Sequence, residues 1–331
     1  MPGLKEALYY EKAENGKVKC HLCPNGCLID DGGVGICKVR KNEGGTLYAL
    51  NYGHITSYAY DPIEKKPLYH FYPGSKIFSM GSFGCNFGCE FCQNWQIAHT
   101  KPLTINISDE DILQLAKANG SIGVAYTYNE PSIWYEYVLY ISKKVKEQGL
   151  KNVFVTNGYI EEEPLKKLLP YIDAMNIDLK SMEDDYYKRV CGGRLSPVLK
   201  TIEIASRETH VELTTLVVEG KNSSPDEIEK LAKWISDLDK NIPLHLTRYH
   251  PAYKMQSPAT SYDTLLKAKD VADRYLNFVY IGNVCGADTN TYCPKCGNKL
   301  VDRCYEGEVV GIEDGKCSKC GYEIKKFLKS C

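Results

Sequence analysis

Three cysteines in one short stretch, residues 81–95, carry the most specific chemical signal in the sequence. Cys85, Cys89 and Cys92 are spaced C-x3-C-x2-C. Cysteine thiolates are the usual protein ligands of iron–sulfur clusters, whereas a structural zinc site needs four ligands. No fourth cysteine lies close by in the sequence, so the spacing favours a four-iron cluster with one iron left free of protein ligands. Reduced cysteines without a metal are the plain alternative.

A second set of four cysteines lies near the N-terminus. Cys20, Cys23, Cys27 and Cys37 are spaced C-x2-C-x3-C-x9-C. Four thiolates can complete a tetrahedral zinc site or hold a second iron–sulfur cluster, and the residues alone do not separate the two metals. Cysteines without a ligand are the third interpretation, because spacing by itself shows no metal.

The C-terminal segment holds two short motifs that each carry a pair of cysteines. Cys293 and Cys296 frame the motif C-P-K-C-G, and Cys317 and Cys320 frame C-S-K-C-G. Two such pairs roughly twenty residues apart are typical of a zinc ribbon, in which the ion supplies folding energy that a small module lacks. We therefore predict one structural zinc here, against the alternative of a disordered cysteine-rich tail.

The composition limits the class of protein. The chain has 331 residues, of which 43% are hydrophobic, so it can build one large domain with small appendages. A net charge of −1 argues against nucleic acid as a partner, and no apolar run reaches the length of a membrane span. The 15 cysteines gather in clusters and the chain does not open on a signal peptide, which favours metal sites over disulfides and a cytoplasmic location.

Segments of strand type alternate with helical segments after residue 74. The expected strands are 76–80, 124–128, 152–156, 174–179, 211–218, 244–249 and 277–281. The expected helices are 108–119, 132–148, 164–171, 196–207, 225–238 and 262–275. Repeated strand–helix units predict a parallel sheet with covered faces. The predicted fold class is therefore α/β, a partial (βα)6 TIM-like barrel, with a doubly wound open sheet as the alternative.

Shifts in composition divide the chain into three predicted parts. Residues 1–73 are a cysteine-rich segment with short strands, residues 74–285 form the partial barrel, and residues 286–331 form the zinc-ribbon-like domain. The barrel should carry the chemistry, because catalytic groups in α/β folds gather at the carboxyl ends of the parallel strands. The three-cysteine loop does follow the first strand of this part.

Other expected strands also end in polar side chains, which should face the same pocket as the cysteine loop. The candidate residues at these ends are Glu130, Thr156, Asn157, Asp178, Lys180, His250 and Asn283. Taken singly, each is equally compatible with an ordinary strand-end residue, such as a carboxylate paired with a lysine.

The cysteine loop resembles the signature of the radical S-adenosylmethionine (SAM) enzymes, C-x3-C-x-aromatic-C, with Phe91 at the aromatic position. The resemblance implies that the open iron binds the amino and carboxyl groups of SAM. One electron, from a donor of the ferredoxin or flavodoxin type, then cleaves the sulfonium and yields a 5′-deoxyadenosyl radical that abstracts hydrogen from a substrate. In such enzymes the cofactors carry the chemistry and the protein positions them.

The strand-end residues resemble those of the glycyl-radical-enzyme activating enzymes. By that resemblance Glu130 binds the amino group of SAM, and Thr156 and Asp178 lie near its carboxylate, where a monovalent cation can bind. Three further positions match the lysine of a D-L-K motif, a histidine near the ribose and substrate, and the backbone near the adenine: Lys180, His250 and Asn283.

Two features separate this chain from the activating enzymes: the cluster motif follows a long N-terminal segment, and the other cysteines lie before it and at the far end. Over nearly the whole chain the sequence more closely resembles the radical SAM enzyme of the AmmeMemoRadiSam system, on the runs 20–24, 66–71, 85–95 and 128–131. That resemblance names no substrate, which we expect to be a protein or a small molecule.

We therefore interpret the chain as a radical SAM enzyme with a [4Fe–4S] cluster, SAM and zinc. The alternatives are an enzyme that places a radical on a protein glycine, and a non-catalytic zinc and iron–sulfur module that docks nucleic acid or protein.

Overall fold

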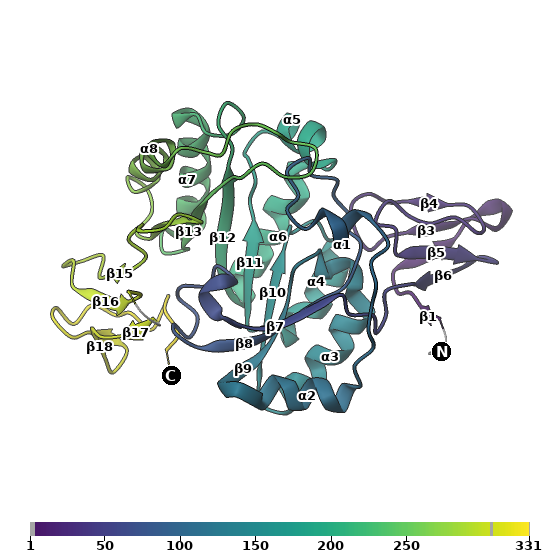
Figure 1. Ribbon diagram of the computed structural model, residues 1–331, viewed down its shortest axis with the longest axis horizontal. Coiled ribbons are helices and arrows are strands. Elements are labelled where there is room, and N and C mark those ends of the chain that lie inside the picture. The colour runs from purple at the N-terminus through teal and green to yellow at the C-terminus, as the bar shows by residue number, and fades with distance from the viewer. Residues whose placement is uncertain (1–3, 305–306, 331) are drawn as a thin grey trace.

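The structure is a computed structural model that describes residues 4–304 and 307–330. An eight-stranded sheet runs through the centre of the molecule (Figure 1). In spatial order its strands are β14 (Val279–Gly282), β13 (Leu244–Arg248), β12 (His210–Val217), β11 (Ala174–Asp178), β10 (Lys151–Thr156), β9 (Ser121–Tyr126), β8 (Lys76–Gly81) and β7 (Ser57–Pro62).

Strands β8 to β14 are parallel and neighbour one another in chain order, while β7 pairs antiparallel with β8 at one edge. The register of β11 and β12 places Asp178 opposite Thr214, at the carboxyl ends of both strands. A doubly wound sheet reverses its strand order part-way. Among the described strands there is no such reversal, so the predicted parallel α/β class is confirmed and the doubly wound alternative is wrong.

Serine caps set the starts of three helices that connect these strands. The side chains of Ser108, Ser224 and Ser261 each accept a hydrogen bond from a backbone N–H three residues on, as N-cap serines do. No helix in the described ranges is both long and apolar enough to cross a lipid bilayer. The helices are α1 (Trp95–His99), α2 (Asp109–Lys117), α3 (Tyr135–Glu147), α4 (Glu162–Leu168), α5 (Asp184–Tyr186), α6 (Leu195–Glu208), α7 (Pro225–Asp239) and α8 (Tyr262–Ala272).

The N-terminal segment forms two small antiparallel sheets beside the large one (purple in Figure 1). A buried ion pair holds it in place, because the Arg40 guanidinium donates to both carboxylate oxygens of Glu136 in α3 at 2.8 and 2.9 Å. β7, which precedes the predicted boundary at residue 73, pairs with β8 along all six of its residues. The boundary itself stays a prediction. The strands of the small sheets are β1 (Lys5–Glu6), β6 (Thr46–Ala49) and β5 (Arg40–Glu43), and β2 (Tyr10–Lys12), β3 (Val18–Cys20) and β4 (Leu28–Ile29).

The C-terminal segment lies on the opposite side of the large sheet (yellow in Figure 1). Its core is shared with β14, since Phe278 and Tyr280 are buried in one cluster with Leu300 and Phe327. The backbone of Lys329 also pairs with the chain around His70, at 2.7 and 2.8 Å. The strands are β15 (Thr291–Tyr292), β16 (Lys299–Asp302), β17 (Glu308–Val309), β18 (Ile312–Glu313) and β19 (Lys316–Cys317).

Candidate active site

The cysteine loop begins where β8 ends and forms part of the wall of a large cavity. Cys85, Cys89 and Cys92 all line this cavity, which has a volume of about 1160 Å³. Gly84, just before the first of them, has a φ of +87°, and a Cβ there would lie 2.6 Å from the backbone oxygen of Cys37. Only glycine can adopt this left-handed backbone conformation and approach the Cys37 backbone so closely, so Gly84 allows the loop to pack against the N-terminal segment.

The three thiols suit a metal cluster better than they suit free cysteines. Burial raises the pKa of the Cys85 thiol well above its usual value and raises the pKa of Cys92 to about 11. A thiolate at such positions needs a strong positive partner, and coordinated iron is one. With three cysteine donors on the wall of an open cavity, the residues present fit a four-iron cluster bound through three of its irons.

A further thiol, which the sequence spacing did not reveal, lies beside the loop. Cys191 ends a π-helical turn (Tyr187–Cys191), and its hydrogen-bonding contact with Cys89 lowers the pKa of Cys89. The Cys191 backbone oxygen accepts from the Gly88 N–H at 2.7 Å. Hydrogen bonds to ligand sulfurs are one means of setting a cluster's reduction potential, and π turns are frequent at functional sites.

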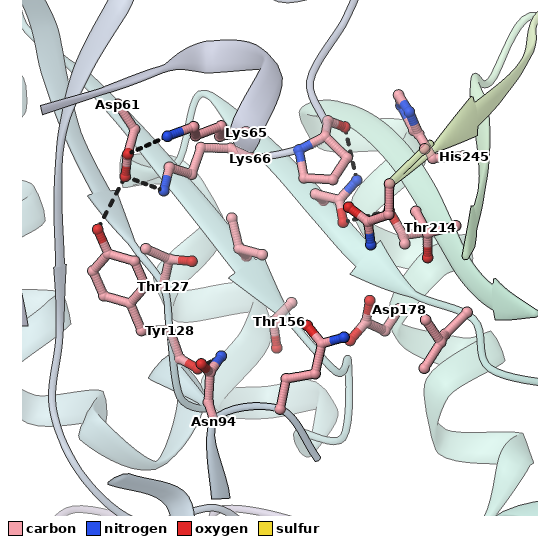
Figure 2. A pocket seen from close by; sticks show the side chains of 18 of the residues that line it. Asp61, Lys65, Lys66, Asn94, Thr127, Tyr128, Thr156, Asp178, Thr214 and His245 are labelled. Atoms are coloured by element: carbon pink, nitrogen blue, oxygen red, sulfur yellow. Dashed lines mark hydrogen bonds and ion pairs between the residues drawn. The ribbon is translucent and has the colours of Figure 1, made fainter. Parts of the chain in front are cut away.

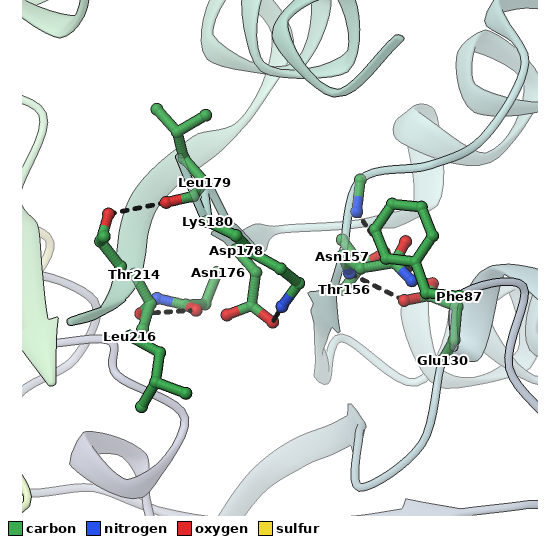
Figure 3. Close-up of polar contacts among 12 residues, drawn as sticks. Phe87, Glu130, Thr156, Asn157, Asn176, Asp178, Leu179, Lys180, Thr214 and Leu216 are labelled. Atoms are coloured by element: carbon green, nitrogen blue, oxygen red, sulfur yellow. Dashed lines mark hydrogen bonds and ion pairs between the residues drawn. The ribbon is translucent and has the colours of Figure 1, made fainter. Parts of the chain in front are cut away.

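Glu130, which follows β9, is the centre of a buried hydrogen-bond network (Figure 3). Its carboxylate accepts from the Thr156 hydroxyl at 2.6 Å and from two backbone N–H groups at 2.7 and 2.9 Å. Burial raises the pKa of Glu130, and these donors oppose the rise by favouring the charged form. The Asn157 amide donates to Asn86 at 2.9 Å and lies 3.8 Å from the sulfur of Cys85. The network therefore connects the ends of β9 and β10 to the cysteine loop.

Asp178 and Lys180 form an ion pair at the end of β11, with 2.8 Å between Oδ2 and Nζ (Figure 3). The Lys180 side chain is 9% exposed and its ammonium lies 5.6 Å from the ring centroid of Phe91. Burial disfavours the charged lysine, but the Asp178 carboxylate and neighbouring cysteine thiolates raise the pKa of Lys180 well above its usual value. The pair therefore places a fixed positive charge beside the loop and a carboxylate on the cavity wall.

The structure brings most, but not all, of the candidates from the sequence to this cavity. His250 is exposed and does not line it, because it lies two residues beyond the end of β13. His245, inside β13, lines the cavity instead, and a histidine within an apolar strand is the sequence signal for it. The candidates that line the cavity are Phe91, Glu130, Thr156, Asn157, Asp178, Lys180 and Asn283.

Charged groups from outside the strand ends also line the cavity (Figure 2). On one side, Asp61 accepts from Lys66 at 2.8 Å and from the Tyr128 hydroxyl at 3.0 Å. On the other, Nε2 of His245 lies 2.7 Å from the buried carboxylate of Glu212. The cavity is therefore polar on two sides as well as at the cysteine loop.

The C-terminal segment contributes to the same wall. Arg303 lines the cavity with its guanidinium 4.5 Å from the ring centroid of Tyr69, and it donates to the Thr291 hydroxyl and to the Thr289 backbone oxygen, both at 2.8 Å. Sequence reasoning missed this arginine, because it lies between the two cysteine motifs and belongs to neither.

The C-terminal cysteines themselves form a compact group. The sulfurs of Cys293 and Cys320 lie 3.7 Å apart, as do those of Cys296 and Cys317. All four sulfurs lie within 4.8 Å of one another. The predicted grouping of these residues is confirmed.

Comparison with known proteins decides the family. The model of the Radical SAM superfamily matches residues 81–235, a range that contains the cysteine loop and the ends of β8 to β12. The chain carries a radical SAM domain over these residues. This domain supports a [4Fe–4S] cluster and SAM as its cofactors, and it makes this radical SAM protein an enzyme.

Similarity to individual proteins differs in extent along this radical SAM chain. The uncharacterised protein MJ0808 of Methanocaldococcus jannaschii is 42% identical over 336 residues, which cover 98% of this chain and 100% of that protein. The pyruvate formate-lyase-activating enzyme of Clostridium pasteurianum is 28% identical over 177 residues, which cover 50% of this chain and 72% of that enzyme. The structure of Streptococcus suis SuiB bound to S-adenosylmethionine is 17% identical, with a TM-score of 0.51 over 65% of this chain and 50% of that one, and shares the α/β fold.

Proposed function

We propose that Cys85, Cys89 and Cys92 hold a [4Fe–4S] cluster with which the protein cleaves SAM reductively and abstracts hydrogen from a substrate bound beside it. The observation that carries this proposal is that the loop cysteines and the polar strand-end residues, which lie far apart in the sequence, line one cavity of about 1160 Å³. The cluster and SAM, when bound, supply the electron and the hydrogen-abstracting carbon radical, and the protein positions them.

We propose that Glu130 holds the ammonium group of SAM. Its carboxylate is 3% exposed, is fixed by donors from three residues and lines the cavity. A charge-assisted hydrogen bond from a buried ammonium to such a carboxylate is stronger than a neutral one. Asp178, whose side chain is 38% exposed, presents the second carboxylate and could hold a monovalent cation beside the SAM carboxylate.

The remaining wall favours a polar substrate. Lys66, Arg303 and His245 line it, and each is paired with a carboxylate, a carbonyl or an aromatic ring that holds it in place. A substrate with carboxylate, phosphate or amide groups, either a small molecule or a protein side chain, would find donors here. The electron would come from a ferredoxin or flavodoxin type of reductant.

We also propose two features of the structure, namely a partial barrel and a structural zinc site. The sequential parallel order of β8 to β14 supports a partial (βα)6 barrel for residues 74–285. The C-terminal cysteines support one structural zinc, because tetrahedral zinc with bonds of about 2.3 Å places its sulfurs ~3.8 Å apart, close to the 3.7 Å observed.

A second candidate function is the activation of a glycyl-radical enzyme, favoured by the similarity of half of this chain to the Clostridium activating enzyme. Both cysteine-rich segments are instead within the range shared with MJ0808. Assignment to the AmmeMemoRadiSam system stays a prediction.

The proposal is tested by incubating the reconstituted, reduced protein with SAM under anaerobic conditions. We expect 5′-deoxyadenosine and methionine in equal amounts. Cys89→Ala should reduce both products to background, while Cys304→Ala, which removes an exposed thiol outside the cavity wall, should not. Equal turnover in the two variants would refute the proposal. Deuterium passing from a labelled candidate into 5′-deoxyadenosine would then identify the substrate.

A further inference from the structure

The four N-terminal cysteines lie around one small cavity, but more widely spread than the C-terminal four. Cys20, Cys23, Cys27 and Cys37 all line a cavity of about 10 Å³. Three of them are buried and Cys27 is half-buried. In the described part of the chain, the C-terminal set is the one group of three or more such ligands whose atoms all lie within 4.8 Å. The N-terminal sulfurs therefore surround a space instead of closing on one point.

This spread argues against a single zinc ion. Zinc bonds of about 2.3 Å draw four sulfurs to ~3.8 Å from one another, and such a frame has no room for anything but the ion. The three loop cysteines, whose surroundings fit a four-iron cluster, are also spread more widely than 4.8 Å. Sets of four cysteines are the ordinary ligands of iron–sulfur clusters, so the N-terminal set suits a second one.

A buried arginine indicates that the group in this cavity is anionic. Arg40 lines the cavity and is 1% exposed. Its two terminal nitrogens donate to Glu136, but Nε has no hydrogen-bond partner among the described residues. Leaving a buried charged donor unsatisfied is costly. Thiolate or sulfide sulfur in the cavity would accept this bond, and it is a better acceptor than a neutral thiol.

The N-terminal cysteines also contact the catalytic loop through residues next to the ligands of both sets. Asn25, between Cys23 and Cys27, donates to the backbone oxygen of Asn86 at 2.8 Å, and Asn86 follows the first loop cysteine. On the other side, the backbone oxygen of Cys37 packs against Gly84. Two short routes therefore lead from one cysteine set to the other.

We propose that Cys20, Cys23, Cys27 and Cys37 bind a second four-iron cluster, which takes one electron from the external reductant and passes it to the cluster of the catalytic loop. In each turnover the reductant loses one electron, the N-terminal cluster is reduced and reoxidised, and the electron leaves the catalytic cluster to cleave the carbon–sulfur bond of SAM. The relay rests on the proposed function, whereas the presence of the second cluster does not.

The cluster is tested in the full chain with the variant Cys85→Ala/Cys89→Ala/Cys92→Ala, which leaves the N-terminal cysteines intact. We expect about eight iron atoms per chain in the wild type and about four in the variant, with a reducible cluster signal in the electron paramagnetic resonance (EPR) spectrum of both. Zinc should be about one per chain in both. A variant with no iron overturns the proposal, with two zinc ions marking an N-terminal zinc site and one zinc ion marking free thiols. Iron content does not depend on SAM cleavage, so failure of the proposed function would be seen separately, as two clusters without cleavage.

The relay is tested with Cys27→Ala, which changes the least buried ligand, against Cys304→Ala as control. Reduction of the catalytic cluster by flavodoxin, followed by stopped-flow absorbance, should slow by at least about tenfold, which corresponds to about 1.4 kcal/mol on a barrier. Reduction by dithionite should keep its wild-type rate. Flavodoxin reduction at the wild-type rate, or equal slowing with both donors, overturns the relay. If Cys27→Ala loses both clusters, freeze-quenched EPR of the wild type decides, because the N-terminal cluster must be reduced first.

Discussion

The cysteine loop and the C-terminal cysteine set present the same kind of ligand atom, a cysteine sulfur, in opposite ways. In the C-terminal set, four thiols lie within 4.8 Å of one another, as in a site closed around one ion. In the loop, three thiols lie on the wall of a cavity of about 1160 Å³, with carboxylates at the neighbouring strand ends. A closed set has no position for a reactant, whereas an open set does. The number of cysteines and the space they face therefore distinguish structure from chemistry.

The two regions are nevertheless not independent. Arg303, which comes from between the C-terminal cysteine motifs, lines the cavity into which the loop cysteines face. Tyr280 of β14 and Phe278, which directly precedes this strand, are buried against the C-terminal segment. Deleting that segment would expose these rings and open the wall. We expect its metal to act on the site through the fold and not by contact with the cofactors.

The largest effect should come from removing a cysteine of the loop. Cys85→Ala removes one of three cluster ligands, so SAM cleavage should fall to background, and the variant should lose the iron of the loop. Zinc content and melting temperature should stay near wild type, because the C-terminal set is untouched. Metal analysis, product assay and calorimetry on one preparation measure all four quantities. Loss of zinc along with the iron would show that the two regions are not separate sites.

Removing a cysteine of the C-terminal set should have the converse result, with loss of zinc and no loss of loop iron. Cys317→Ala should release about one zinc ion per chain and lower the melting temperature, because metal binding supplies folding energy to small modules. The iron of the loop should remain. Cys304→Ala, an exposed cysteine in the same segment, is the matched control. Unchanged zinc content in Cys317→Ala would contradict the closed site.

A smaller effect is expected at Glu130, because changing this carboxylate should weaken SAM binding and leave the cluster in place. Glu130→Gln keeps the size of the side chain and removes the charge, so loss of a charge-assisted bond to SAM should cost about 1.5–3 kcal/mol, a roughly 10- to 150-fold rise in Kd. The iron content should not change. Glu161→Gln, at an exposed position, serves as control for surface charge. An unchanged Kd for SAM in Glu130→Gln would remove Glu130 from the cofactor site.

The smallest effect should appear at His70, where the C-terminal segment packs on the large sheet. Burial lowers the pKa of His70 to about 3, and its ring packs on Phe278 and Phe327. As the pH falls below 6.5, the unfolded chain takes up a proton that the fold does not accept until about pH 3, so the free energy of unfolding should decrease by up to about 1.4 kcal/mol per pH unit. His70→Gln should lack this part of the decrease between pH 6.5 and pH 5 in urea titrations. Parallel curves for wild type and variant would show that His70 titrates in the fold.

The sequence predicted those parts of the fold that depend on local patterns. The helix expected at 262–275 is observed at Tyr262–Ala272, because its Ser261 cap and apolar spacing are local features. The loop cysteines and most strand-end candidates line the cavity because parallel strands bring their carboxyl ends together.

The features that the sequence did not predict depend on contacts between distant segments. His245 rather than His250 lines the cavity because the pairing of β13 with its neighbours places it there. Cys191 reaches Cys89 through a π-helical turn, and Arg303 reaches the wall through the packing of the C-terminal segment on β14. The spread of the N-terminal cysteine sulfurs, on which the proposed second cluster rests, is likewise not encoded by their spacing along the chain.

In the proposed function, the three-cysteine loop leaves one coordination position on its cluster, and SAM occupies it. Electron–nuclear double resonance on the reduced protein, with SAM labelled with ¹⁵N in its amino group, tests this claim most directly. We expect a hyperfine coupling between the labelled nitrogen and the reduced loop cluster, present in Cys304→Ala and absent in Cys85→Ala. A reduced loop cluster that binds SAM without any coupling to the labelled nitrogen would contradict it.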